Sequence, residues 1–260
     1  MLLEGKVAIV SGIGPGMGRD ISLALAREGA DIVLGARTEA KLLEVAKEVE
    51  ALGRKALPVV TDIEDEDACL NIAERAEAEL GGIDILVNNA FWQPPFETIE
   101  DNSMEVWQQA FNINLFGGVR MTKAAIPALR KSDAASVIFI ASMSARKIEA
   151  EFGAYAATKA AILSTVRTLA VELGGDGIRV NSVLPGYIWG DSVEWYFKWL
   201  AEQKGITPEE QYDSVASETA LNHLPTSAEI ADSVVFFASP LSRVVTGQTL
   251  DVNGGHWFGP

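Results

Sequence analysis

The chain is poor in cysteine and histidine. Cys69 is its one cysteine among 260 residues, so no disulfide can form within the chain, which is typical of a reducing compartment. The two histidines, His223 and His256, lie far apart in the sequence and fit no metal-binding spacing. We therefore expect no metal ion, no histidine-based catalysis, and a packing role for Cys69 inside a helix.

Positive charge and long apolar runs are scarce as well. The 21 Lys and Arg residues face 36 Asp and Glu residues, which gives a net charge of −15. Such a surface repels the phosphates of nucleic acids and of anionic membranes, so neither is an expected partner. No run is long enough to span a bilayer, and the apolar segment at the start is too short for a signal peptide. We expect a soluble, cytoplasmic protein.

Short apolar runs alternate with amphipathic helical patterns through most of the chain. Runs without polar alternation are typical of strands buried on both faces. The pattern predicts an α/β fold, a doubly wound parallel sheet of about seven strands with helices on both faces, in one domain over 1–260. The expected strands are 7–10, 31–34, 56–60, 83–87, 136–140, 179–184 and 249–252. The expected helices are 17–28, 39–52, 65–80, 103–130, 152–173 and 227–238.

A glycine-rich turn, SGIGPGMG at 11–18, joins the first expected strand to the first expected helix. Glycines let the backbone approach a pyrophosphate closely, and the helix N-terminus offers free N–H groups and a positive dipole end. The spacing G-x-x-x-G-x-G differs from G-x-G-x-x-G because Gly14 and Pro15 stand inside it. Glycines also make ordinary tight turns, but this position predicts a Rossmann-type dinucleotide site, mainly within residues 1–150.

The end of the second expected strand, GAR at 35–37, bears on the choice of cofactor. NAD-binding folds commonly place an acidic residue here for the ribose 2′-hydroxyl, whereas an Arg accommodates a 2′-phosphate. Ala36 and Arg37 offer no carboxylate to repel a phosphate and one guanidinium to attract it. This favours NADP(H), with NAD(H) possible, although Arg37 could also be an ordinary surface residue.

The apolar stripe of the helix expected at 152–173 leads into two polar residues, Lys159 and Tyr155. Such a pair is often part of a core, with the tyrosine hydroxyl satisfied and the lysine reaching water. The rest of the chain decides between that interpretation and a catalytic one.

Six features occur in a fixed order along the chain. They are SGIGPGMG at 11–18, NNA at 88–90, FNIN ending at Asn114, Ser142 in FIASMS, Tyr155-x-x-x-Lys159, and PG at 185–186. Together they resemble the classical short-chain dehydrogenase/reductase family, over residues 5 to 255. Because the signals agree at several levels, the set is far more specific than any one piece.

The resemblance implies a catalytic tetrad of Asn114, Ser142, Tyr155 and Lys159. A free tyrosine titrates near pH 10, and a cationic lysine one helical turn away lowers that pKa. Tyr155 would then be the acid in ketone reduction and the base in alcohol oxidation. Ser142 would position the substrate oxygen, Lys159 would also bind the nicotinamide ribose, and Asn114 would hold a water in a proton relay.

The resemblance also implies which residues hold the cofactor. Asp62 and Ile63 would contact the adenine, Asn88 and Ala90 would line the cofactor, and Pro185 and Ile188 would flank the nicotinamide. The full implied set is Ser11, Gly12, Gly14, Gly16, Met17, Gly18, Arg37, Asp62, Ile63, Asn88, Ala90, Tyr155, Lys159, Pro185, Gly186 and Ile188. The chain departs from the family at Ser11, where threonine is usual, at Phe91, where NNAG has glycine, and at Gly190, where a threonine usually meets the carboxamide.

Residues 186–226 are the one irregular region, and the resemblance implies that they form a substrate lid. Val193, Tyr196, Phe197 and Leu200 make one helical stripe there, and Trp195 and Trp199 make a second. One face can pack on the domain, and the other could meet an apolar substrate or another subunit. With Trp92 and Trp189 these tryptophans predict a bulky hydrophobic substrate, such as a terpenoid, a steroid or an aromatic ketone.

The expected activity is hydride transfer between NADP(H) and a small-molecule secondary alcohol or ketone. The alternatives are a 3-oxoacyl-thioester reductase, a non-catalytic dinucleotide-binding sensor or scaffold, and a lyase or epimerase, which usually has a longer chain. By the same resemblance we expect a homotetramer, or a homodimer, with the C-terminal GQTLDVNGGHWFGP in its interface.

Overall fold

One parallel sheet organises the chain, of which the computed structural model describes residues 1–259 apart from the side chain of Ser192. Its seven strands lie in the order β3-β2-β1-β4-β5-β6-β7. They are β1 (Val7–Ser11), β2 (Asp31–Ala36), β3 (Ala56–Val60), β4 (Ile85–Asn88), β5 (Ser136–Ile140), β6 (Arg179–Pro185) and β7 (Thr249–Val252). The strand order reverses between β1 and β4, as in a doubly wound Rossmann-type fold, so the predicted fold class is confirmed. Pro260 of the predicted domain lies outside the described residues.

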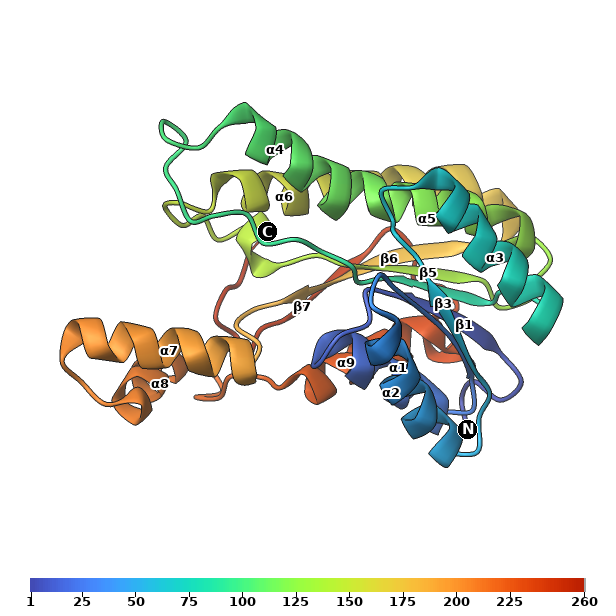
Figure 1. Cartoon of the computed structure of the whole chain (residues 1–260), viewed down its shortest axis with the longest axis horizontal. Helices are drawn as coiled ribbons and strands as arrows, with labels where there is room; N and C mark the ends of the chain where they lie inside the picture. The colour runs from blue at the N-terminus through green and yellow to red at the C-terminus, as the bar shows by residue number, and fades with distance from the viewer. Residues whose placement is uncertain (260) are drawn as a thin grey trace.

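Helices cover both faces of the sheet (Figure 1). α1 (Met17–Arg27), α2 (Glu39–Ala51) and α9 (Ser227–Ala238) lie on one face, and α3 (Glu66–Leu80), α4 (Met104–Phe111), α5 (Gly118–Leu129) and α6 (Gly153–Leu173) lie on the other. Successive strand residues point to opposite faces, so Ile9 joins one core cluster while Ala8 and Val10 join the second. Both faces of the strands are therefore buried, which explains their unbroken apolar runs.

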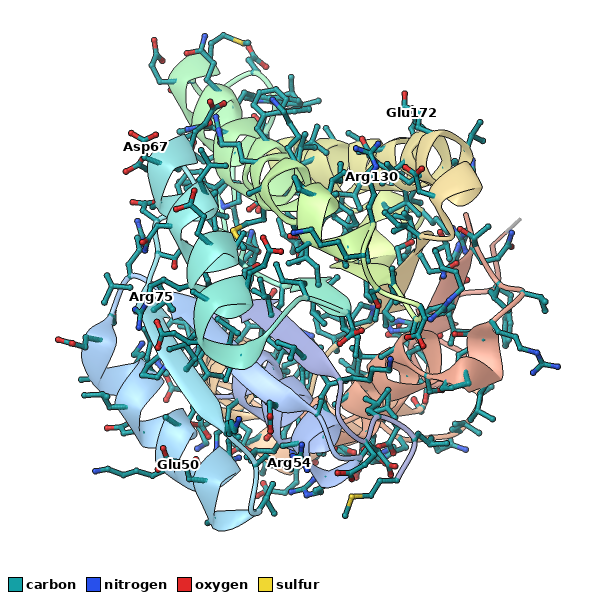
Figure 2. All side chains as sticks on the ribbon, turned by 90° about the vertical axis from the view of Figure 1, so that its right-hand side faces the viewer. Glu50, Arg54, Asp67, Arg75, Arg130 and Glu172 are labelled. Carbon is teal, nitrogen blue, oxygen red and sulfur yellow. The ribbon has the colours of Figure 1, made fainter. Side chains whose placement is uncertain are left out.

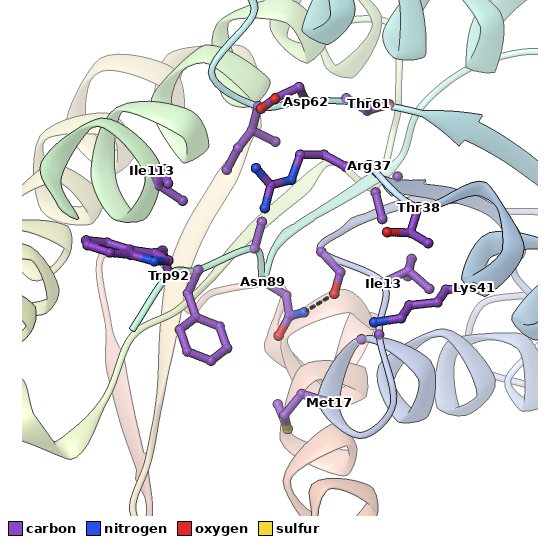
Figure 3. A pocket seen from close by; sticks show the side chains of 18 of the residues that line it. Ile13, Met17, Arg37, Thr38, Lys41, Thr61, Asp62, Asn89, Trp92 and Ile113 are labelled. Carbon is purple, nitrogen blue, oxygen red and sulfur yellow. Dashed lines mark hydrogen bonds between the residues drawn. The ribbon is translucent and has the colours of Figure 1, made fainter. Parts of the chain in front are cut away.

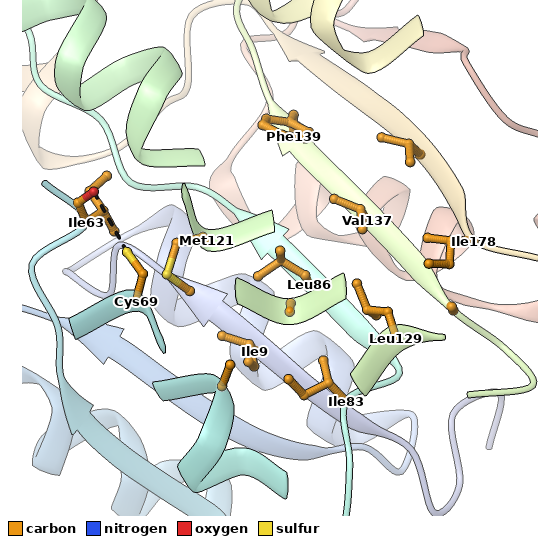
Figure 4. Close-up of a cluster of buried hydrophobic side chains, with 14 of the residues drawn as sticks. Ile9, Ile63, Cys69, Ile83, Leu86, Met121, Leu129, Val137, Phe139 and Ile178 are labelled. Carbon is orange, nitrogen blue, oxygen red and sulfur yellow. Dashed lines mark hydrogen bonds between the residues drawn. The ribbon is translucent and has the colours of Figure 1, made fainter. Parts of the chain in front are cut away.

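The core beneath α3, α5 and α6 is closely packed around the central strands (Figure 4). Cys69 lies in it at 1% exposure, and its thiol lies 3.8 Å from the carbonyl oxygen of Ile63. Burial raises the pKa of this thiol to about 11, so it stays protonated at neutral pH. Charged side chains such as Glu50, Asp67 and Glu172 are exposed on the outer surfaces of the helices instead (Figure 2).

The helix predicted over 103–130 is interrupted. A wider π-helical turn, Asn112–Gly117, separates α4 from α5. Residues outside this helix contact the turn. The Asn112 amide donates to Glu64 Oε1 at 2.6 Å. Ile63 packs so closely on Gly117 that a Cβ there would lie 2.4 Å from Cδ1 of Ile63. Helical periodicity cannot reveal such a turn, because these tertiary contacts specify it.

The region predicted as irregular, 186–226, contains two helices, α7 (Asp191–Lys204) and α8 (Pro208–Ala216), which Figure 1 shows projecting beyond the sheet. Gly205 ends α7 in a left-handed conformation, φ 67. Thr207 and Glu210 then form a capping box, with Pro208 in the first turn of α8. The helical stripe expected from Val193 to Leu200 lies in α7, whereas α8 was not expected although its start signals are present in the sequence.

Within residues 1–259, no helix combines the length and the apolar character needed to cross a membrane.

Candidate active site

A cleft of about 350 Å³ opens at the carboxyl ends of β1, β2 and β3, beside the reversal of strand order (Figure 3). The glycines of the turn above it have different tasks. A Cβ on Gly12 would lie 2.4 Å from Cα of Ala90, and one on Gly18 would lie 2.3 Å from the oxygen of Gly12, so both permit close packing. Gly14 and Gly16 have open space instead. Because Gly16 begins α1 without a side-chain cap, the helix N-terminus remains available to an anion.

The far end of the cleft carries a cationic group. Arg37, Thr38 and Lys41 are exposed and line the cleft. Figure 3 shows the Arg37 side chain near Asp62 and the Lys41 side chain near Ile13. Lys41, in the first turn of α2, was missed from the sequence. Two cations and a hydroxyl suit a phosphate monoester better than a ribose hydroxyl.

Several predicted cofactor residues meet at this cleft. Those that line it are Gly12, Gly14, Met17, Gly18, Arg37, Asp62, Ile63 and Ala90. Ser11 lies beneath it at 2% exposure, and its hydroxyl donates to the oxygen of Val87 at 3.3 Å. Gly16 caps α1 above the cleft without lining it.

Asn88, which was predicted to line the cofactor, lies outside this cleft. Its amide donates to Thr122 Oγ1 at 3.0 Å, on the face toward α5, and the residue does not line the cleft. The next residue, Asn89, lines the cleft and donates to the oxygen of Gly12 at 2.8 Å. Side chains alternate at a strand end, so a shift of one position moves the amide to the other face.

The residues predicted to flank the nicotinamide lie outside this cleft, at the end of β6. A Cβ on Gly186 would lie 2.9 Å from Cβ of Asn253, so the glycine is needed where the chain packs beside the end of β7. Ile188 is half-buried against the second core cluster, and Pro185 pairs with Val252.

Tyr155 and Lys159 lie one turn apart in α6, with the Lys159 Nζ 5.5 Å from the centroid of the Tyr155 ring. The Lys159 ammonium donates to the oxygen of Ile140 at 2.9 Å, and the residue is 3% exposed. Burial lowers the pKa of Lys159 to about 7. Burial raises the pKa of Tyr155 to about 12, and a hydrogen bond with Ser142 acts in the opposite direction. Three members of the predicted tetrad thus meet at the ends of β5 and α6.

Asn114 is engaged on both sides of its carboxamide. Its Oδ1 accepts from the Trp92 N–H at 2.7 Å, and its Nδ2 donates to the Trp92 oxygen at 3.0 Å and to Thr158 Oγ1 at 3.3 Å. Thr158 in turn donates to the oxygen of Tyr155 at 2.7 Å. Asn114 therefore ties the segment after β4 to the start of α6, and among the described residues no hydrogen bond joins its side chain to Lys159.

The tryptophans predicted to face substrate lie in three different environments. Trp92 is half-buried and lines the cofactor cleft, because Asn114 fixes its backbone (Figure 3). Trp189 packs between Phe197 and Tyr212, with ring centroids 5.8 and 4.5 Å away, inside the lid. Trp195 is 69% exposed and Trp199 is 46% exposed.

A series of aromatic rings connects the lid with Tyr155. Trp199 stacks on Tyr196, Tyr196 lies 6.4 Å from Phe96, and Phe96 lies 4.9 Å from Phe152. Phe152 meets the edge of Tyr155 at 6.5 Å. Phe96 was missed from the sequence, because its place in this series depends on tertiary packing.

Comparisons with known proteins find similarity over nearly the whole chain. A family model described as enoyl-(acyl carrier protein) reductase matches residues 12–256. General stress protein 39 of Bacillus subtilis (strain 168) is 38% identical over 256 residues, covering 98% of this chain and 85% of the relative.

Two solved structures are also similar over nearly the whole chain. One is 7 alpha-hydroxysteroid dehydrogenase with NADH and 7-oxo glycochenodeoxycholic acid, at TM-score 0.87 and 32% identity, covering 97% of this chain and 94% of that one. The other is carveol dehydrogenase from Mycobacterium avium with NAD, at TM-score 0.92 and 29% identity, covering 98% of each chain. Among residues 1–259, no group of three or more His, Cys, Asp and Glu side chains is placed to hold a metal ion.

Proposed function

The chain belongs to the short-chain dehydrogenase/reductase family and is an oxidoreductase. From this premise we propose that it transfers a hydride between NADP(H) and a secondary alcohol/ketone pair, with a bulky hydrophobic substrate. The observation that carries the proposal is that a dinucleotide cleft, with Arg37, Thr38 and Lys41 among its lining residues, lies beside the Tyr155–Lys159 pair. Phe91 lines the cleft, and its ring lies 6.5 Å from that of Tyr155.

The residues present fit a dinucleotide phosphate. Gly14 and Gly16 leave open space at an uncapped helix N-terminus, which suits a pyrophosphate. Arg37 and Lys41 would bind the 2′-phosphate, and Asp62 with Ile63 would contact the adenine. When bound, NADP(H) supplies or accepts the hydride. Two similar structures contain NADH and NAD, whereas the cationic Arg37 and Lys41 support the phosphorylated cofactor for this chain.

Tyr155 is the proton donor in the proposed reduction. Since burial keeps its phenol neutral at neutral pH, the proton is in place for transfer to the carbonyl oxygen. Ser142 would hydrogen-bond that oxygen and orient the carbonyl. Lys159, when protonated, stabilises the phenolate left behind, and Asn114 holds the neighbouring segments in position. We also propose that Asn114 holds a water molecule in a proton relay that runs through Lys159.

A bulky hydrophobic substrate is supported by the aromatic rings that extend from Tyr155 through Phe96 to Trp199. Two similar proteins are named for, or bound to, alicyclic compounds, carveol and 7-oxo glycochenodeoxycholic acid. The matching family model supports a second candidate, reduction of a 3-oxoacyl thioester at its ketone, because its description names an acyl carrier protein. A non-catalytic sensor is the third, and it predicts cofactor binding without turnover.

A homotetramer or homodimer is part of the proposal. β7 has a neighbour on one side only, so its other edge is available to a second copy. Leu241 and Val244, shortly before it, are 60% and 87% exposed. Light scattering across a concentration series tests this assembly, and a monomer at every concentration would contradict it.

Consumption of NADPH, with NADH in parallel, tests the function. The substrates are ketones graded from small to polycyclic and a 3-oxoacyl thioester, each tried with wild type and Tyr155→Phe. We expect turnover of bulky ketones with NADPH, a loss of about 10²-fold or more in Tyr155→Phe, and unchanged cofactor affinity in that variant. Thioester turnover alone would move the substrate to the second candidate, and tight cofactor binding without any turnover would favour the third.

A further inference from the structure

Phe91 lies at the junction of the cofactor cleft and the Tyr155–Lys159 pair. It lines the cleft, and its side chain is 58% exposed. Its ring meets that of Tyr155 edge to face, with centroids 6.5 Å apart and planes at 66°. The same ring lies 5.7 Å from the Lys159 Nζ.

The surroundings of Lys159 give this ring its importance. The ammonium has one hydrogen-bond acceptor in the described part of the chain, the oxygen of Ile140, and the rings of Tyr155 and Phe91 lie beside it. Lys159 is 3% exposed, whereas Phe91 next to it is largely exposed. Phe91 is therefore the outer layer between this cation and the water of the cleft.

We propose that Phe91 is a positioning residue whose ring covers the Lys159–Tyr155 pair on the cleft side and keeps water from it. The proposal rests on the catalytic roles assigned above to Tyr155 and Lys159. This chain has an apolar side chain here, whereas the family has glycine at this position of NNAG.

Two effects of the ring on Lys159 oppose each other. Exclusion of water disfavours the cation, whereas the face of an aromatic ring attracts it. Burial lowers the pKa of Lys159, so we expect the exclusion of water to outweigh the attraction of the ring. Removing the cover should therefore make Lys159 a stronger base, and the better hydrated pair should then stabilise the Tyr155 phenolate.

Two variants separate these effects. Phe91 has no positive φ angle, so Phe91→Ala removes the cover without backbone strain. Phe91→Leu keeps an apolar cover and removes the aromatic face. Phe258→Ala is the control, since it truncates a phenylalanine that is 81% exposed in the C-terminal segment.

Competitive labelling of amines across pH, with the Lys159 peptide followed by mass spectrometry, gives the pKa of Lys159 without any substrate. We expect titration near 7 in wild type and a rise of about one unit in Phe91→Ala, with Phe91→Leu and the control unchanged. The second readout is the pH profile of alcohol oxidation, which we expect to shift toward lower pH in Phe91→Ala.

Two results would overturn the proposal: a Lys159 titration in Phe91→Ala that superimposes on wild type, or a Phe91→Leu variant that shifts as far as Phe91→Ala. If the labelling result holds and no ketone or alcohol is turned over, the proposed function fails while the cover over Lys159 stands.

Discussion

The cofactor part and the lid of this protein are stabilised in different ways. Two large clusters of buried side chains, one on each face of the sheet, support the strands and turns that surround the cofactor cleft. The lid, residues 186–226, has a small cluster of its own with three buried members, Phe197, Ala216 and Leu224. Around these three, half-buried aromatic rings such as Trp189 and Tyr212 supply most of the contact.

Polar contacts join this segment to the C-terminal residues. The Leu221 N–H donates to the oxygen of Gly254 at 3.0 Å, and Glu218 Oε2 lies 3.1 Å from His256 Nε2. The same Glu218 oxygen lies 3.9 Å from the Lys147 Nζ. A region with few buried apolar contacts opens more easily than the core. From this difference we expect that the strands and turns around the cleft are a fixed part of the fold, while residues 186–226, the proposed lid, can change without loss of the fold.

The largest expected effect comes from removing the centre of the lid. Phe197→Ala should cost the lid about 3–5 kcal/mol of local stability, because Phe197 is 1% exposed. We expect faster amide exchange in α7 and α8, a higher KM for bulky ketones, and NADPH affinity unchanged within about twofold. Hydrogen exchange measured by mass spectrometry checks this.

Val171→Ala is its control, since Val171 is 84% exposed on α6. If exchange in Phe197→Ala also rises around the glycine turn at 11–18, lid and cofactor part are one cooperative unit and the comparison fails.

The next effect concerns the cofactor side alone. The double variant Arg37→Ala, Lys41→Ala should weaken NADPH binding about 10²-fold, because two charge-assisted contacts to one phosphate are lost. NADH binding should change by less than about threefold, since it has no 2′-phosphate. Fluorescence titration of both cofactors measures the ratio.

Lys47→Ala is the matched control, because this exposed lysine of α2 does not line the cleft. An equal loss of NADPH and NADH affinity in the double variant would assign Arg37 and Lys41 a general role rather than discrimination.

The smallest effect compares two capping boxes. Thr226 and Glu229 begin α9 in the cofactor part, and Thr207 with Glu210 begin α8 in the lid. The hydrogen bond from the Thr226 backbone, together with the one from His223, lowers the pKa of Glu229 from its ordinary value of 4.5 to about 2. A lowered pKa stabilises the fold above the unfolded value, so this contribution is lost as the pH falls from about 4.5 to about 2.

Glu229→Gln should therefore lower the free energy of unfolding at neutral pH by less than about 1 kcal/mol, because the carboxylate is half exposed. We expect a correspondingly small decrease in Tm. The difference from wild type should vanish near pH 2. Glu210→Gln should leave Tm unchanged and speed exchange in α8 alone. Equal Tm losses in both variants would contradict the separation of lid and cofactor part.

Much of the fold and part of the candidate site could be predicted from the sequence, because their signals are local. All seven strands are confirmed, and the glycine turn lies between β1 and α1 as expected. Tyr155 and Lys159 share one helical face by spacing alone, so their proximity was foreseeable. Their catalytic roles, and those of Ser142 and Asn114, remain predictions.

What could not be predicted depends on contacts between distant segments. The sequence does not show that Asn89 rather than Asn88 faces the cleft, or that Asn114 binds the backbone of Trp92. That Trp92 faces the substrate stays a prediction. Lys41 and Phe96 gain their places through the packing of α2 and of the segment after β4.

Transfer of deuterium from labelled NADPH tests the central claim most directly. NADPH carrying deuterium at its transferable nicotinamide position is incubated with a bulky ketone and wild type or Tyr155→Phe, and the alcohol product is analysed by mass spectrometry. The account predicts one deuterium on the carbinol carbon with wild type and almost no product with Tyr155→Phe. Product without deuterium, or equal product from both proteins, would contradict it.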